Sequence, residues 1–146
     1  DTDGRVLFQM IETFVLDRPH ACAFTSLGQL RYLSCIQHVD GVVGNSSSGL
    51  AEVPSFRKPT INIGDRQRGR LKAESVIDCL PQSDVIATSI KLALSPVFQQ
   101  QLQQPFLNPY GEGGASEAIV TKLEAIEFTD LLKKSFYDFE SDQSAR

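Results

Sequence analysis

The sequence of 146 residues has few side chains of the kinds that form metal sites and disulfide frameworks. It contains three cysteines, two histidines, one methionine and no tryptophan. There is no CxxC pair, and His20 and His38 lack the spacing of a ligand motif, so we expect no metal site. Cys22, Cys35 and Cys79 are widely spaced in apolar settings, which predicts reduced core thiols in a cytoplasmic protein.

Long apolar runs and an excess of positive charge are also missing. No apolar run approaches the roughly 18 residues of a membrane span. The opening DTDGRVLFQM lacks the basic region and apolar core of a secretory signal. The formal net charge of −4 argues against broad binding to nucleic acids. A hydrophobic content of 41% is ordinary for a globular domain, so we expect a buried hydrophobic core. Because no apolar run is long enough to span a membrane, we expect no membrane partner.

The pattern of apolar residues predicts an α/β fold. Helical spacing predicts helices over 4–16, 28–37, 50–55, 83–94, 96–103, 116–125 and 128–139. Short apolar runs predict strands over 21–25, 41–44, 60–63 and 75–78, the last at a sheet edge, and proline and glycine predict a loop over 106–114. This alternation predicts a Rossmann-like parallel sheet with helices on both faces. We expect one domain over 1–140 and a tail over 141–146.

A loop rich in glycine and serine, residues 44–49, follows the predicted strand 41–44. Its glycines allow a sharp turn, its hydroxyls can donate to phosphoryl oxygens, and a helix begins directly after it. This serine loop fits a phosphate site, and it equally fits an N-capped turn without a ligand. Sharper motifs fail, because Leu50 and Ala51 replace the Lys-Ser of a Walker A loop and Ser48 stands where a nucleophile elbow needs glycine.

An acidic residue and a basic loop complete the candidate ligand edge. Glu52 can complement the helix dipole, or its two oxygens can accept both hydroxyls of a ribose. Residues 65–70, DRQRGR, follow the strand 60–63 and form either solvated surface or a bidentate grip on phosphate. Because parallel strands end at one sheet edge, we expect this arginine loop beside the serine loop, with Arg66 facing inward. The mixture suits a nucleoside diphosphate.

Groups for base recognition and for proton transfer are harder to assign. Leu27 and Tyr32 flank the turn after 21–25 and could form an apolar slot for a base, although Tyr32 also fits the core. His20 lies at the edge away from the ligand, and His38 ends a helix, so neither is expected to be catalytic. No pair of acid–base carboxylates stands at the ligand edge. The sequence therefore predicts groups that bind a ligand but no residues that carry out proton transfer.

The stretch SLGQLRYL, the run VDGVVGNSSSGLAEVPSFRKPTINIGDRQRGR and the segments ESVID, DTDGR and NPYGEGGAS carry a resemblance. They resemble the hydrolysing UDP-N-acetylglucosamine 2-epimerases, above all the bacterial branch that makes N-acetylmannosamine for sialic acid. The likeness covers nearly the whole chain. In that family two Rossmann-like domains face each other as in the GT-B glycosyltransferases. The resemblance implies that this chain is the carboxy-terminal, UDP-binding half with its first strands absent.

The resemblance also implies the roles of single residues. The substrate-binding set is Ser46 and Ser47 for the diphosphate, Glu52 for the ribose hydroxyls, Arg66 beside the phosphates, and Leu27 and Tyr32 for the uracil pocket. Arg70 and Gln67 are weaker candidates. The family's acid–base carboxylates and a histidine belong to segments upstream of Asp1, so we expect no catalytic residue here and no activity of the chain alone.

The reaction implied by the resemblance needs no nicotinamide or other cofactor. UDP leaves by anti elimination to give a 2-acetamidoglucal, and water then adds to yield N-acetylmannosamine. The expected partners are UDP or UDP-N-acetylglucosamine, a missing amino-terminal domain and a second copy in a homodimer. A nucleotide-binding module without catalysis and the donor domain of a GT-B glycosyltransferase remain the alternatives.

Overall fold

A computed structural model describes residues 4–127 of the chain. The chain divides into two compact units, Asp1–Gly111 and Glu112–Arg146. Within the described residues every strand belongs to the first unit, and the second unit contributes α6 (Ala115–Ala125). The predicted helix over 128–139 and the predicted tail over 141–146 lie outside the described residues, and the single domain over 1–140 stays a prediction.

The first unit is built on a parallel sheet of three strands, which confirms the predicted α/β class. The strands are β1 (Val42–Gly44), β2 (Thr60–Ile63) and β3 (Val76–Cys79), in the spatial order β1-β2-β3. Val42 pairs with Thr60 in the register of β1 and β2, and Thr60 pairs with Val76 in the register of β2 and β3. All three strands therefore end at one edge of the sheet, where ligands of open α/β sheets bind.

Apart from the helices predicted over 50–55 and 128–139, the predicted helices are confirmed with ends that differ by at most two residues. The longer helices of the first unit are α1 (Gly4–Leu16), α2 (Gly28–His38) and α4 (Ser83–Ala93). The shorter helix α5 (Pro96–Gln101) follows α4. Ser95 caps the start of α5: its Oγ accepts a hydrogen bond of 3.3 Å from the Phe98 N–H, and Pro96 is the first helical residue. The segment 106–114 contains no helix or strand, as its proline and glycine content predicts.

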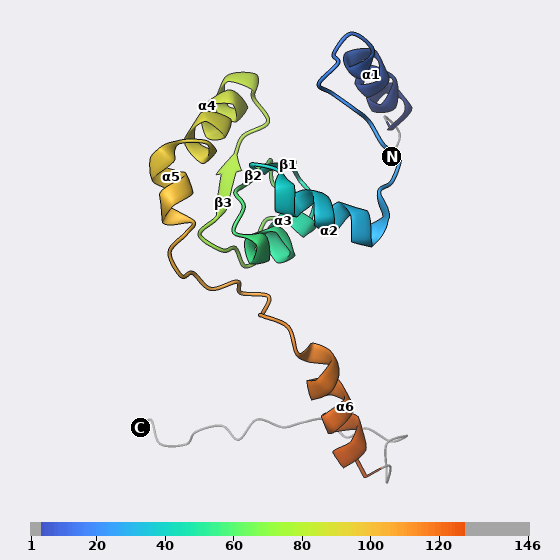
Figure 1. The fold of residues 1–146 in the computed structure, drawn as a ribbon, viewed down its shortest axis with the longest axis vertical. Helices are drawn as coiled ribbons and strands as arrows, with labels where there is room; N and C mark the ends of the chain where they lie inside the picture. Colours follow the sequence, from blue (N-terminus) through green and yellow to red (C-terminus); the bar gives the residue numbers. More distant parts are fainter. Residues whose placement is uncertain (1–3, 128–146) are drawn as a thin grey trace, which may run out of the picture. The chain divides into compact units, whose positions relative to one another are not determined.

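Helices cover both faces of the sheet (Figure 1). On one face Ile61 and Cys79 pack against Ala93 of α4, and these three buried residues form the centre of the core. On the other face Thr60 lies against α3 (Ser48–Ala51), and its Oγ1 donates a hydrogen bond of 2.8 Å to the Gly49 carbonyl. The alternation of side chains along β2 thus joins the core to the helix that follows the serine loop.

The predicted helix over 50–55 forms as two pieces and starts earlier. Helix α3 (Ser48–Ala51) is followed by the 3-10 helix η1 (Val53–Phe56). Pro54 lies at the start of η1, and proline has no N–H with which to continue an α-helical ladder. The turn tightens instead, with the Ser55 N–H donating to the Glu52 carbonyl at 3.1 Å.

Two expectations, the strand over 21–25 and the three core thiols, are wrong. Residues 21–25 form no strand, because a strand needs a hydrogen-bonded neighbour and no strand among residues 4–127 pairs with this segment. Cys22 and Cys35 are exposed, and only Cys79 of the three predicted core thiols is buried.

Among the described residues, no helix has the length and apolar character needed to cross a membrane.

Candidate functional site

The serine loop and the arginine loop meet at the carboxyl ends of β1 and β2. Arg66 Nη1 donates a hydrogen bond of 3.3 Å to Asn45 Oδ1, and Gln67 Nε2 donates one of 2.7 Å to the Asn45 carbonyl. Gln67 is 4% exposed, so its side chain fills the space between the loops, whereas Arg66 is exposed. The predicted convergence of the two loops is therefore present, and Asn45 is the residue that joins them.

The hydroxyl groups of the serine loop divide into exposed and engaged ones. Ser46 and Ser47 are exposed, although Ser46 Oγ also accepts a hydrogen bond of 3.3 Å from the Ser48 N–H. Helix α3 is only four residues long, so its dipole contributes little to anion binding. Of the residues predicted to bind phosphate, Ser46, Ser47 and Arg66 are thus all exposed at this edge.

A cavity of about 600 Å³ lies between the start of α2 and Glu52, the residue that directly follows α3. Three of the predicted site residues, Leu27, Tyr32 and Glu52, line it together with Phe24 and residues 26, 28 and 29. Leu27, Tyr32 and Glu52 are each half-buried. The structure thus gathers an aromatic ring, an aliphatic side chain and a carboxylate around one space, which is the mixture of apolar wall and few polar groups that small-molecule sites share.

The polar groups of this cavity form a chain of hydrogen bonds. Tyr32 Oη lies 2.7 Å from Ser48 Oγ, and Ser48 Oγ donates to Glu52 Oε2. Ser48 has one hydroxyl proton and gives it to Glu52, so Tyr32 is the donor in its bond with Ser48. Within residues 4–127, Glu52 Oε1 has no hydrogen-bond partner. One oxygen of the carboxylate is therefore held by Ser48, and the other makes no hydrogen bond to residues 4–127.

Residues of the late segment NPYG bond to the chain just after the serine loop and its helix α3 and just after the arginine loop. Asn108 is 7% exposed, and its Nδ2 donates hydrogen bonds of 2.9 Å to the Ala51 carbonyl and 2.8 Å to Ser55 Oγ. Tyr110 Oη donates a bond of 3.1 Å to the Leu71 carbonyl, directly after the arginine loop. The carboxyl end of α3 and the end of the arginine loop are thus tied to one short segment.

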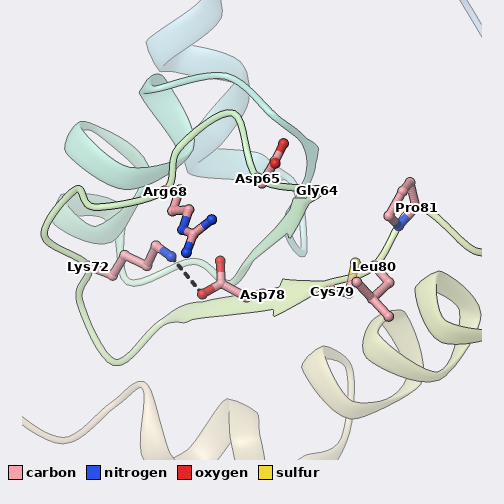
Figure 2. Close-up of a pocket in the computed structure, with 8 residues that line it drawn as sticks. All are labelled: Gly64, Asp65, Arg68, Lys72, Asp78, Cys79, Leu80 and Pro81. Carbon is pink, nitrogen blue, oxygen red and sulfur yellow. Dashed lines mark hydrogen bonds and ion pairs between the residues drawn. The ribbon is translucent and has the colours of Figure 1, made fainter.

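A second cavity, of about 560 Å³, lies at the ends of β2 and β3 and contains none of the predicted site residues. Figure 2 shows the charged ends of Arg68 and Lys72 turned toward Asp78 in this cavity. Lys72 Nζ lies 2.7 Å from Asp78 Oδ2, and Asn62 Nδ2 donates a bond of 2.7 Å to Asp78 Oδ1. Burial alone raises the pKa of Asp78, but the hydrogen bonds from Lys72 and Asn62 and the Lys72 charge outweigh it and hold that pKa below 3.8.

The lowered pKa of Asp78 predicts a pH-dependent contribution to stability. Because the folded pKa lies below the unfolded value of 3.8, ionised Asp78 stabilises the fold above pH 3.8. This contribution is lost as the pH falls through the folded pKa. Urea unfolding of the intact protein and of Asp78→Asn should differ at pH 7 and converge below pH 3.8. The difference should be modest, because the Asp78 side chain is 55% exposed, and a constant difference at all pH values would contradict the assignment.

Two residues of the site carry no signal that identifies them in the sequence. Both Asn45 and Ser48 have the sequence context of an ordinary polar loop. In the structure, Asn45 joins the two loops and Ser48 holds the Glu52 carboxylate. Gln67 was a weak candidate, and its burial between the loops explains why a neutral amide stands among arginines. Arg70 is exposed and makes no side-chain hydrogen bond to residues 4–127, so it stays a weaker candidate.

Comparison with known proteins identifies related chains. The family described as UDP-N-acetylglucosamine 2-epimerase matches residues 1–124. The GDP/UDP-N,N'-diacetylbacillosamine 2-epimerase (hydrolyzing) of Campylobacter jejuni is 34% identical over 139 residues, which are 94% of this chain and 36% of that protein. The polysialic acid biosynthesis protein P7 of Escherichia coli is 40% identical over 108 residues, 73% of this chain and 27% of that protein.

A third relative shows the same partial coverage. The UDP-N,N'-diacetylbacillosamine 2-epimerase (hydrolyzing) of Legionella pneumophila is 31% identical over 126 residues, which are 86% of this chain and 32% of that protein. The chain thus spans about a third of the length of these relatives. The family match extends over the parallel sheet, the serine loop, the arginine loop and the NPYG segment. The chain therefore belongs to the UDP-N-acetylglucosamine 2-epimerase family.

Proposed function

We propose that this chain provides the UDP-binding site of a hydrolysing UDP-N-acetylglucosamine 2-epimerase. The observation that carries the proposal is the meeting of the two loops through Asn45, which leaves Arg66 beside the exposed hydroxyls of Ser46 and Ser47. A guanidinium group and hydroxyls at the carboxyl edge of a parallel sheet are suited to phosphate oxygens. The net charge of −4 gives no general attraction for anions, so binding would rest on this local cluster.

The cavity next to α3 suits the nucleoside part of the same ligand. Leu27 and the Tyr32 ring offer an apolar slot for the uracil, and the free Oε1 of Glu52 offers an acceptor for ribose hydroxyls. Ser46 and Ser47 directly precede the four-residue helix α3 and Glu52 directly follows it, so we propose that one nucleoside diphosphate engages the loops and the cavity together. The Tyr32 hydroxyl and Ser48 would then hold the carboxylate while the ring and Leu27 contact the base.

The proposed reaction is an elimination followed by a hydration. The C2 proton of the sugar is removed, the C1–O bond to UDP breaks, and a 2-acetamidoglucal forms. Water then adds with its hydroxyl at C1 and its proton at C2, which gives N-acetylmannosamine. The role of Arg66 and the serine hydroxyls is to stabilise the negative charge that develops on the departing diphosphate. The acid–base groups are proposed to lie outside this chain, which would act in a cytoplasmic homodimer.

Incubation of the whole enzyme, of which this chain would be the UDP-binding part, with UDP-N-acetylglucosamine in deuterated water tests the proposal. The expected products are UDP and N-acetylmannosamine that carries deuterium at C2, detected by proton NMR. A parallel reaction with UDP-N,N'-diacetylbacillosamine compares the substrate named for two of the relatives. Release of N-acetylglucosamine without deuterium would indicate simple hydrolysis, transfer of the sugar to an acceptor would indicate a glycosyltransferase, and UDP binding without turnover would indicate a non-catalytic module.

A further inference from the structure

Glu52 is held by two residues from different elements. Ser48 lies one helical turn before Glu52 and donates to its Oε2, while Tyr32 reaches Ser48 from α2. The hydrogen bonds Tyr32–Ser48–Glu52 therefore link α2 to the Glu52 carboxylate, and both Tyr32 and Glu52 line the cavity. All three residues are half-buried, so their hydrogen bonds are partly shielded from competing water.

We infer that Ser48 is a positioning residue that sets the preference of the site for a ribonucleotide, an inference that rests on the proposed function. A glutamate side chain has three rotatable bonds and loses much conformational freedom when it binds a diol. The Ser48 hydroxyl fixes Oε2 beforehand and leaves Oε1 without a partner among residues 4–127, so less freedom is lost when a ligand binds. Tyr32 supports this arrangement because its proton occupies an acceptor site of Ser48 and leaves the Ser48 proton for Glu52.

The alternative is that Ser48 serves only the folding of the loop, since its N–H also donates to Ser46 Oγ. The two roles differ in their effect on ligands. A folding role weakens every nucleotide alike, because it disturbs the whole site. A role through Glu52 acts only on ligands that carry ribose hydroxyls. UDP and 2′,3′-dideoxyuridine diphosphate differ in those hydroxyls alone and therefore separate the two roles.

The test measures the dissociation constants of both nucleotides by calorimetry on the intact protein. The unmodified protein should bind UDP about 10- to 100-fold more tightly than the dideoxy nucleotide, the range expected for hydrogen bonds to a carboxylate. Ser48→Ala should reduce this preference about 5- to 10-fold, with little change for the dideoxy nucleotide. Tyr32→Phe keeps the ring and should reduce the preference by a smaller factor, and Ser48→Thr keeps the hydroxyl and should preserve it.

Ser34→Ala is the matched control, because Ser34 is exposed and bonds only to the Leu30 carbonyl of its own helix. It should leave both dissociation constants unchanged. Equal weakening of both nucleotides by Ser48→Ala, or a lowered melting temperature that accounts for the loss, would overturn the inference. An unchanged preference in Ser48→Ala would overturn it while leaving the proposed function intact. Absence of UDP binding by the unmodified protein would overturn the proposed function itself, and the inference with it.

Discussion

Replacing Gly49 with alanine is expected to lower the free energy of unfolding by about 1–3 kcal/mol, the cost of overpacking a tight contact. A Cβ at Gly49 would lie 2.6 Å from Thr60 Cγ2. Thr60 is 2% exposed and its Oγ1 is bonded to the Gly49 carbonyl, so it cannot turn away without breaking that bond. Helix α3 would have to move off β2, and Glu52 and the serine loop would move with it. Urea unfolding and UDP calorimetry on the intact protein measure both effects.

The sign of this change separates crowding from helix propensity. In an ordinary helix interior, glycine to alanine stabilises by about 1 kcal/mol, so a loss at Gly49 requires a steric cause. Thr60→Ser removes the Cγ2 methyl group and keeps the hydroxyl. By itself it should cost about 1 kcal/mol for the buried methyl group. The double variant should then be about as stable as Thr60→Ser alone, and simple addition of the two losses would contradict the steric explanation.

Replacing Arg66 with alanine is expected to weaken UDP binding about 10- to 100-fold, equal to about 1.5–3 kcal/mol for lost charged hydrogen bonds. Arg66 is exposed and donates one hydrogen bond to Asn45, which orients the guanidinium. The other N–H groups of the guanidinium can then donate to phosphate oxygens. Arg66→Lys keeps the charge and loses the bidentate fork, so an intermediate affinity is expected. Calorimetry on the intact protein at fixed ionic strength gives the three values.

Arg68→Ala is the matched control for Arg66→Ala. It removes the same charge from the same loop, but Arg68 lines the other cavity with Lys72 and Asp78 (Figure 2). The long-range electrostatic change is similar in the two variants, so the difference between them reports the local contact. Arg68→Ala should therefore lose only a small part of the affinity. Equal losses in the two variants would show that the loop acts through its net charge, and the assignment of Arg66 would fail.

The parts of the site that follow strand ends could be predicted from the sequence. Serine and arginine residues after two short apolar runs mark neighbouring loops, because parallel strands end at one edge. The resemblance placed Leu27, Tyr32 and Glu52 around a uridine, and the structure brings these three to one cavity. Local periodicity was sufficient to predict the helices, whose hydrogen bonds join residues close in sequence.

The contacts that hold the site could not be predicted in this way. The bond from Asn108 to the Ala51 carbonyl joins residues 57 positions apart, and no local pattern reports such a pair. The segment 21–25 has the composition of a strand, but pairing depends on a neighbour that composition does not reveal. The exposure of Cys22 and Cys35 has the same origin, since an apolar setting in the sequence becomes a core only where other elements cover it.

The hydrogen bonds made by the NPYG segment have a consequence for protein engineering. Asn108 holds the end of α3 and Tyr110 holds the chain after the arginine loop, 39 positions away at Leu71. A graft of residues 44–70 into a foreign scaffold would carry the groups proposed to face a ligand. It would lack Asn108 and Tyr110, whose hydrogen bonds hold this segment. The transferable module is thus discontinuous in sequence, and a chimaera that includes 108–110 keeps the spacing between the two halves of the binding edge.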